Sequence, residues 1–125
     1  MKRFCLALAC VLPFLPSVAL GGVADSPLPE LVAGQTTYHL YSVLGITNPG
    51  GTAVMFSCTS TDTVPLQASV ELFGQFGGAP ENDAVASSLT VAAGATVIFG
   101  TSNTPYISPN SLVSSLGSRG SARIL

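Results

Sequence analysis

The chain has 125 residues, of which 47% are hydrophobic and only 8% carry a charge, with a formal net charge of −2. This length corresponds to one domain, and the apolar content suffices for a buried core, whereas disordered chains combine low hydrophobicity with high charge. The lack of a basic excess argues against binding to nucleic acid or to an anionic membrane surface, because both require clustered lysine and arginine.

The first 24 residues have the three parts of a secretory signal peptide. Two basic residues open the chain, residues 4–20 are almost wholly apolar, and small residues precede the first acidic residue, Asp25. This order is typical of export signals, since the basic end stays in the cytoplasm while the apolar stretch enters the membrane. Cleavage after Ala19 and cleavage after Ala24 both fit the preference of the protease for small side chains.

Two other interpretations of this segment are less consistent with its length. A membrane anchor needs about 20 apolar residues, and Pro13 and Pro16 interrupt the apolar stretch. Lipoprotein processing at Cys10 would leave an apolar core of about six residues, below the roughly 7–15 of ordinary signals. We therefore expect a signal peptide over residues 1–24, a secreted or periplasmic location, and no membrane span after its removal. The mature chain then carries six acidic residues against two arginines.

The segment that follows the signal has no clear periodicity. Residues 25–35 contain two prolines and are predicted to form a linker or an irregular first strand. From residue 36 onward, short segments alternate apolar and polar residues with a period of two, and no apolar stripe of helical period follows residue 24. In the first of these segments, residues 36–47, one face is predicted to carry Tyr38, Leu40, Leu44 and Ile46.

The next two segments are also bounded by turn residues. An Asn-Pro-Gly-Gly turn at residues 48–51 precedes residues 52–60. In this segment, Val54, Phe56 and Cys58 are predicted to lie on one face of a strand. After a turn at residues 62–65, the alternation is the clearest in the chain. It places one set inward, namely Leu66, Ala68, Val70 and Leu72. It places the other set outward, namely Gln67, Ser69, Glu71 and Gln75.

The remaining strands are predicted after a loop at residues 74–84 that is rich in glycine and acidic residues. Residues 85–101 contain a turn around Gly94. The inward residues on its two sides are Leu89, Val91, Val97 and Phe99. Residues 100–118 are polar and are predicted to be a long connection. The last segment, at residues 120–125, directs Ala122 and Ile124 inward.

Six short strands with turn signals about ten residues apart predict an all-β domain over residues 36–125. We expect two antiparallel sheets packed as an immunoglobulin-like sandwich. The last strand runs to Leu125 without a following turn, and an unprotected sheet edge is unusual in native proteins. We therefore expect that the natural protein continues beyond a truncated end, or that a partner supplies the missing last strand.

Several segments resemble a loose group of exported bacterial β-sandwich proteins of immunoglobulin-like type, most of them uncharacterised. The resemblance covers residues 36–124 and is carried by ITNPGGTAVMFSCTSTDTVPLQASVELFG, GAPENDA, LTVAAGATVIFGTS and GSARI. It implies a fold and no particular reaction. In that group, a cysteine at the position of Cys58 is followed by another in a strand after the Ala-Arg-Ile segment, which this sequence lacks. Cys5 and Cys10 leave with the signal, so Cys58 is either a free thiol or half of a disulfide with a cysteine outside this sequence.

The sequence has too few of the residues needed for catalysis or metal binding to form such a site. His39 is the one histidine, and no Gly-x-Ser-x-Gly element is present to place a nucleophile. A blue-copper site needs two histidines and a cysteine, whereas the chain offers His39, Cys58 and Met55. The acidic residues at 81–83 lack the spacing of a calcium loop and are interpreted as a solvated turn. We expect no catalytic residue, no cofactor and no metal site.

Two aromatic residues on nominally outward faces, Tyr41 and Phe73, are candidates for a surface patch that contacts a protein or glycan at the cell surface. The sequence as a whole favours a secreted, non-enzymatic structural or binding module at the cell exterior. One alternative is a fimbrial-type assembly subunit completed by a strand from a neighbour. The other is a secreted hydrolase.

Overall fold

The computed structural model describes residues 23, 26–48, 53–101, 110–112 and 119–125. The described residues form strands and loops, and none of them is helical. The strands are β1 (Tyr41–Ile46), β2 (Met55–Thr59), β3 (Leu66–Ala68), β4 (Val70–Gly74), β5 (Leu89–Val91), β6 (Thr96–Gly100), β7 (Asn110–Ser111) and β8 (Gly120–Ile124). The prediction of an all-β chain is therefore confirmed for these residues.

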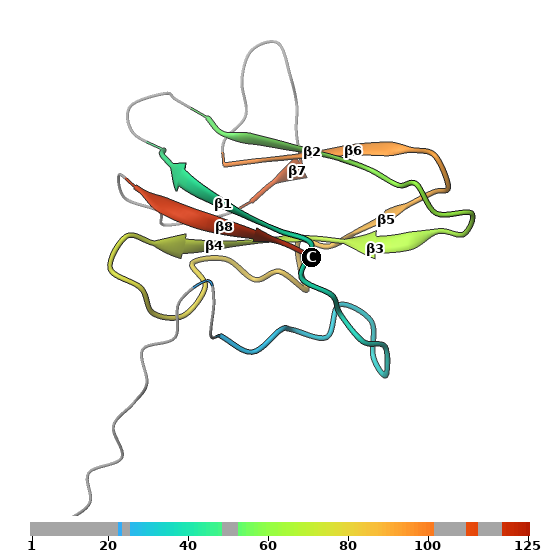
Figure 1. Cartoon of the computed structure of the whole chain (residues 1–125), viewed down its shortest axis with the longest axis horizontal. Coiled ribbons are helices and arrows are strands. Elements are labelled where there is room, and N and C mark those ends of the chain that lie inside the picture. Colours follow the sequence, from blue (N-terminus) through green and yellow to red (C-terminus); the bar gives the residue numbers. More distant parts are fainter. Residues whose placement is uncertain (1–22, 24–25, 49–52, 102–109, 113–118) are drawn as a thin grey trace, which may run out of the picture.

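The strands form three small sheets, with the orders β1-β8-β4, β2-β6-β7 and β3-β5. The pairs are antiparallel except β6 and β7, which run parallel. In Figure 1 the β2–β6 pair is drawn above the β1-β8-β4 sheet, and β3 and β5 extend to one side. Only Ser69 separates β3 from β4, so one extended segment passes from the third sheet into the first.

One hydrophobic core draws side chains from all three sheets. Its buried members are Ile46, Phe56, Ala68, Val70, Leu72, Val91, Phe99, Leu112 and Ala122. The period-two pattern predicts the inward residues of β2, β3, β4, β5, β6 and β8 correctly, because these strands alternate without interruption. Partly buried side chains that pack against the core include Val54, Cys58, Leu66, Leu89, Val97 and Ile124, as predicted.

The prediction for the first strand is wrong for three of its four residues. Ile46 is 1% exposed, whereas Tyr38, Leu40 and Leu44 are 71%, 62% and 78% exposed. The cause is Gly45, which has φ of +71° and lies where the register between β1 and β8 shifts. A glycine in this left-handed conformation forms a β-bulge, which inserts one residue and inverts the alternation that follows. Leu44 therefore faces away from the core while Ile46 faces into it.

Replacement of Gly45 by alanine is expected to destabilise the protein by about 1–2 kcal/mol, because the left-handed backbone is unfavourable for residues that carry a Cβ. Among the described residues no atom lies within 4 Å of the place that this Cβ would occupy, so the cost comes from the backbone alone. Gly45→Asn should cost less, since asparagine tolerates this conformation better. Urea unfolding monitored by circular dichroism measures both. Equal stability of the alanine variant and the natural protein would contradict the bulge.

Loops account for the rest of the described chain. The predicted turn around Gly94 is confirmed, with the N–H of Ala95 donating to the carbonyl of Ala92 at 2.9 Å. Residues 26–35 contain no strand. The long connection predicted for residues 100–118 includes β7, whereas residues 102–109 and 113–118 of it lie outside the described part. The predicted signal, apart from Val23, and most of the turn predicted at residues 48–51 also lie outside it.

The free edge of β4 is covered by the loop that follows it. The side-chain amide of Asn82 accepts the N–H of Leu72 at 2.7 Å and donates to the carbonyl of Val70 at 2.8 Å. The N–H of Glu81 donates to the carbonyl of Leu72 at 2.7 Å. These contacts imitate a further strand and satisfy backbone groups that would otherwise be open to pairing. The interpretation of residues 81–83 as merely a solvated turn is therefore incomplete.

Candidate functional site

A cavity of about 450 Å³ opens beside the β3–β5 sheet. Most of its wall comes from residues 31–32, 35–38 and 40, from residues 58–60 at the end of β2, and from residues 62 and 64–68. Val91 of β5 and residues 124–125 at the end of the chain complete it. A volume of this size lies within the roughly 300–1,000 Å³ that is usual for small-molecule sites. The cavity is therefore large enough for a small ligand, and the chemistry of its lining decides what it can hold.

Apart from Asp62, the lining of the cavity is apolar and neutral. Its inner wall contains the partly buried Leu66 and Ile124 and the buried Val91, while Tyr38 and Val64 are exposed at its rim. Neutral hydrogen-bonding side chains complete the wall: Gln35, Thr36, Thr37, Thr59, Ser60 and Gln67. Gln67 is hydrogen-bonded to Ser88 and Thr90, and Thr59 is hydrogen-bonded to Thr96. Gln35 and Thr36 are therefore the polar residues best placed to bond an uncharged ligand, while the apolar surface contacts its carbon framework.

Asp62 carries the one charge among the described residues that line the cavity. Its Oδ1 accepts the N–H of Thr63 at 2.7 Å, and its own N–H donates to the Oγ of Ser60 at 3.3 Å. The residue therefore shapes the turn between β2 and β3, as the sequence predicts. The described part of the lining offers no cation, so it provides no complement for phosphate or carboxylate groups.

Cys58 lies on β2, where it is partly buried and contributes to the cavity wall. It is a free cysteine in this structure. Burial raises the pKa of the Cys58 thiol, because the charged thiolate loses hydration there. The thiol is consequently less reactive than an exposed cysteine at the same pH.

We expect Cys58 to react with iodoacetamide at pH 8 several-fold more slowly in the folded protein than in urea. The folded state holds a smaller thiolate fraction and restricts access, and both effects disappear on unfolding. The rate should rise with pH beyond the range where free cysteine levels off, since the pKa of this thiol is raised. Mass spectrometry of timed samples measures the rate, with free cysteine as the reference. Equal rates in both states would contradict this account of Cys58.

The predicted patch of Tyr41 and Phe73 does not form. Tyr41 is 72% exposed, whereas Phe73 is 1% exposed and lies under the guanidinium of Arg123, whose Cζ is 5.3 Å from the ring centroid. Phe73 does point away from the core, as the alternation requires, but other parts of the chain cover that face. Tyr41 instead lies on the strand that also exposes Leu44, next in sequence to the cavity residue Leu40.

The second feature is a buried ion pair on the outer face of the β1-β8-β4 sheet. Glu71 of β4 and Arg123 of β8 stand opposite each other in the register. The Nε of Arg123 donates to Oε2 of Glu71 at 2.8 Å, and Nη2 donates to the same oxygen at 2.5 Å. The two side chains are only 2% and 4% exposed. Sequence alternation placed Glu71 on an outward face, and nothing in it indicated that this face is buried.

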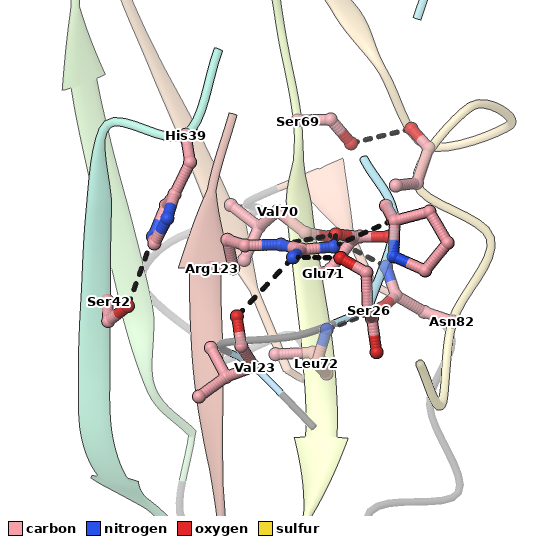
Figure 2. Close-up of polar contacts among 12 residues, drawn as sticks. Val23, Ser26, His39, Ser42, Ser69, Val70, Glu71, Leu72, Asn82 and Arg123 are labelled. Carbon is pink, nitrogen blue, oxygen red and sulfur yellow. Dashed lines mark hydrogen bonds and ion pairs between the residues drawn. The ribbon is translucent and has the colours of Figure 1, made fainter. Parts of the chain in front are cut away.

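Backbone carbonyls of the N-terminal segment, defined here as residues 23 and 26–35, complete the environment of Arg123. Nη1 donates to the carbonyl of Ser26 at 2.8 Å and to that of Val23 at 3.3 Å. Nη2 donates to the carbonyl of Pro27 at 3.2 Å. Figure 2 shows the guanidinium between Glu71 on one strand and these carbonyls. The ion pair thus fastens the N-terminal segment to the sheet.

The one histidine approaches a serine on the exposed edge of the molecule. Nε2 of His39 lies 3.0 Å from Oγ of Ser42, and both residues are exposed (Figure 2). Neither belongs to the cavity wall. Among the described residues, no three or more His, Cys, Asp or Glu side chains gather in a way that could hold a metal ion. In the same part of the chain, no helix is long and apolar enough to cross a membrane.

Comparison of the chain with protein-family models, with curated proteins and with solved structures finds no match. The resemblance to exported bacterial β-sandwich proteins therefore stays a prediction.

Proposed function

We propose that the protein is an exported, non-enzymatic binding module that holds a neutral glycan chain in the cavity beside Tyr38. It acts in the periplasm or outside a bacterial cell, and its fold is an immunoglobulin-like sandwich. The observation that carries the proposal is the open cavity of about 450 Å³ with an exposed aromatic rim and a lining that is neutral apart from Asp62. The signal-like sequence of residues 1–24 supports the location.

The sandwich part of the proposal is supported by the core and the strand order. The core takes residues from all three sheets, which requires that the sheets turn apolar faces toward one another. The passage from β3 into β4 through Ser69 lets one extended segment serve two sheets. An immunoglobulin-like arrangement accounts for both features.

The choice of a neutral glycan follows from the chemistry of the wall. Sugar rings present hydroxyl groups together with apolar C–H faces. The side chains of Gln35 and Thr36 can bond the hydroxyls, and the ring of Tyr38 can lie against a C–H face. An anionic ligand would meet Asp62 without any compensating cation from the described wall. This argument excludes an anionic glycan and leaves a neutral one as the proposed ligand.

The direct test is retention of the purified protein on neutral cell-wall polysaccharides. Tyr38→Ala is expected to weaken binding about tenfold, equivalent to about 1.4 kcal/mol. Phe76→Ala is the matched control, because Phe76 is equally aromatic, is 89% exposed and is not part of the cavity wall. Failure of the natural protein to bind any glycan would contradict the proposal. So would turnover of esterase or glycosidase substrates by the purified protein.

A second candidate is a fimbrial-type assembly subunit that accepts a strand from a neighbour. The observation that favours it is the edge of β1, which pairs only with β8 among the described residues. Tyr41 and Leu44 are exposed there, and the sequence has no charged residue from position 31 to position 61. Natural edge strands are usually covered, as β4 is, or carry charges that prevent pairing.

This candidate is separable from the first by one substitution. Leu44→Lys would place a charge on the open edge and should abolish association in analytical ultracentrifugation. Because Leu44 is 78% exposed, stability should change little. Leu44 is also outside the cavity wall, so glycan binding should be unaffected. A natural protein that is monomeric at every concentration and also binds no neighbour's strand would exclude the second candidate.

A further inference from the structure

The guanidinium of Arg123 uses all of its hydrogen-bonding capacity inside the protein. A guanidinium has five N–H groups, and it cannot lose its charge at physiological pH. Five contacts are present, two to Glu71 and one each to the carbonyls of Val23, Ser26 and Pro27. Three of the five acceptors therefore belong to the N-terminal segment. A buried donor without an acceptor is unfavourable, so the full set matters to the folded state.

The two cleavage positions that fit the signal differ in how many carbonyl acceptors for Arg123 remain in the mature chain. Cleavage after Ala24 removes Val23, and with it the carbonyl that lies 3.3 Å from Nη1. Cleavage after Ala19 leaves Val23, Ser26 and Pro27 together in the mature chain. Only the second product keeps one acceptor for each N–H of the buried guanidinium.

We propose that Val23 is retained in the mature protein, as a resident part of the folded domain rather than of the discarded signal. The inference rests on the proposed export of the chain. The protease acts before folding and does not sense Arg123. Cleavage and the later burial of Arg123 are linked through the sequence. A sequence that specifies one fold is expected to keep, after cleavage, the groups that this fold uses.

The position of the N-terminal segment supports this reading of Val23. The backbone carbonyls of the segment accept hydrogen bonds from Arg123 on the outer face of the sheet. Phe73 is buried on the same face. The contact between Val23 and Arg123 joins residues 100 positions apart in the chain. Val23 is itself partly buried, as expected for a residue that belongs to the domain.

The test is to express the full chain with its own leader in a bacterium and to determine the N-terminus and intact mass of the exported protein. We expect a start at Leu20. Any start at or before Val23 agrees with the inference, and any later start, such as Asp25, overturns it. A chain that keeps all 125 residues retains Val23 but refutes the cleaved signal on which the export proposal depends. The two ideas can therefore fail separately.

Two matched substitutions sharpen the result. Ala19→Leu places a large side chain where the protease requires a small one, and we expect the uncut precursor to accumulate at least tenfold. Ala24→Leu should leave processing unchanged and should yield a mature protein heavier by the mass difference between leucine and alanine. The opposite pattern, with Ala24→Leu blocking processing and Ala19→Leu harmless, would overturn the inference.

Discussion

Glu71→Ala should destabilise the protein by about 3–5 kcal/mol, because removal of one partner leaves the other charge buried without compensation. Arg123 would keep its charge and its burial but would lose the acceptor for two N–H groups. The free energy of unfolding can be measured in urea by circular dichroism, since the chain has no tryptophan. If the alanine variant is already unfolded without urea, Glu71→Gln, which keeps one acceptor oxygen, should give a smaller and measurable loss.

Two controls show whether this loss comes from the buried pair. Glu30→Ala removes a carboxylate from an exposed residue and should change stability by no more than about 0.5 kcal/mol. The double variant Glu71→Leu with Arg123→Met replaces both charges by apolar groups. It should recover much of the loss, because no uncompensated charge remains. A loss of less than about 1 kcal/mol for Glu71→Ala would be the value for a solvent-exposed pair and would contradict this structure.

Phe73→Ala should also cost about 3–5 kcal/mol, the usual range for removal of a buried aromatic side chain. Phe73 is 1% exposed although it points away from the central core. Its ring lies beneath Arg123, so its loss would leave a cavity under the guanidinium as well as remove buried apolar area. The same urea experiment measures the effect.

Phe76→Ala provides the matched comparison for Phe73, three residues away and of the same type. Phe76 is 89% exposed, so its replacement should change the free energy of unfolding by no more than about 0.5 kcal/mol. If Phe73→Ala lowers the free energy of unfolding by no more than Phe76→Ala does, the outer face of β4 is open to water.

Local alternation was sufficient to predict the inward residues of most strands. Val70 and Leu72 on β4, and Phe99 on β6, are buried as their positions in the pattern require. The pattern failed at β1, because a single glycine with positive φ shifts the phase by one residue. The bulge at Gly45 cannot be detected from the alternation of apolar and polar residues, because this alternation runs through Gly45 without a visible break.

The outer face of β4 shows a different limit of sequence reasoning. Alternation correctly separates Glu71 and Phe73 from the core but cannot say whether another segment covers them. That cover comes from residues close to the N-terminus, and the partner of Glu71 lies 52 positions away on β8. Such contacts depend on strand order and register, which cannot be read from the local alternation of a single sequence.

Single residues of the candidate site could be identified from the sequence, but the cavity that they form could not. The sequence singles out Cys58 as a candidate free thiol and Tyr41 as an outward aromatic. Cys58 lies in the cavity wall, and Tyr41 lies on the open edge of β1. The cavity itself is assembled from segments before β1, between β2 and β3, and at the end of β8. Its volume and neutral lining follow from how these segments meet, so no local motif could indicate them.

The most direct test of the proposed function is a nuclear magnetic resonance titration of the ¹⁵N-labelled mature protein with neutral cell-wall oligosaccharides. The account predicts that chemical-shift changes concentrate in residues 35–40 and 58–68, around the cavity, and that they disappear in Tyr38→Ala. Changes centred elsewhere, or no change at millimolar oligosaccharide, would contradict the claim that this cavity is the binding site.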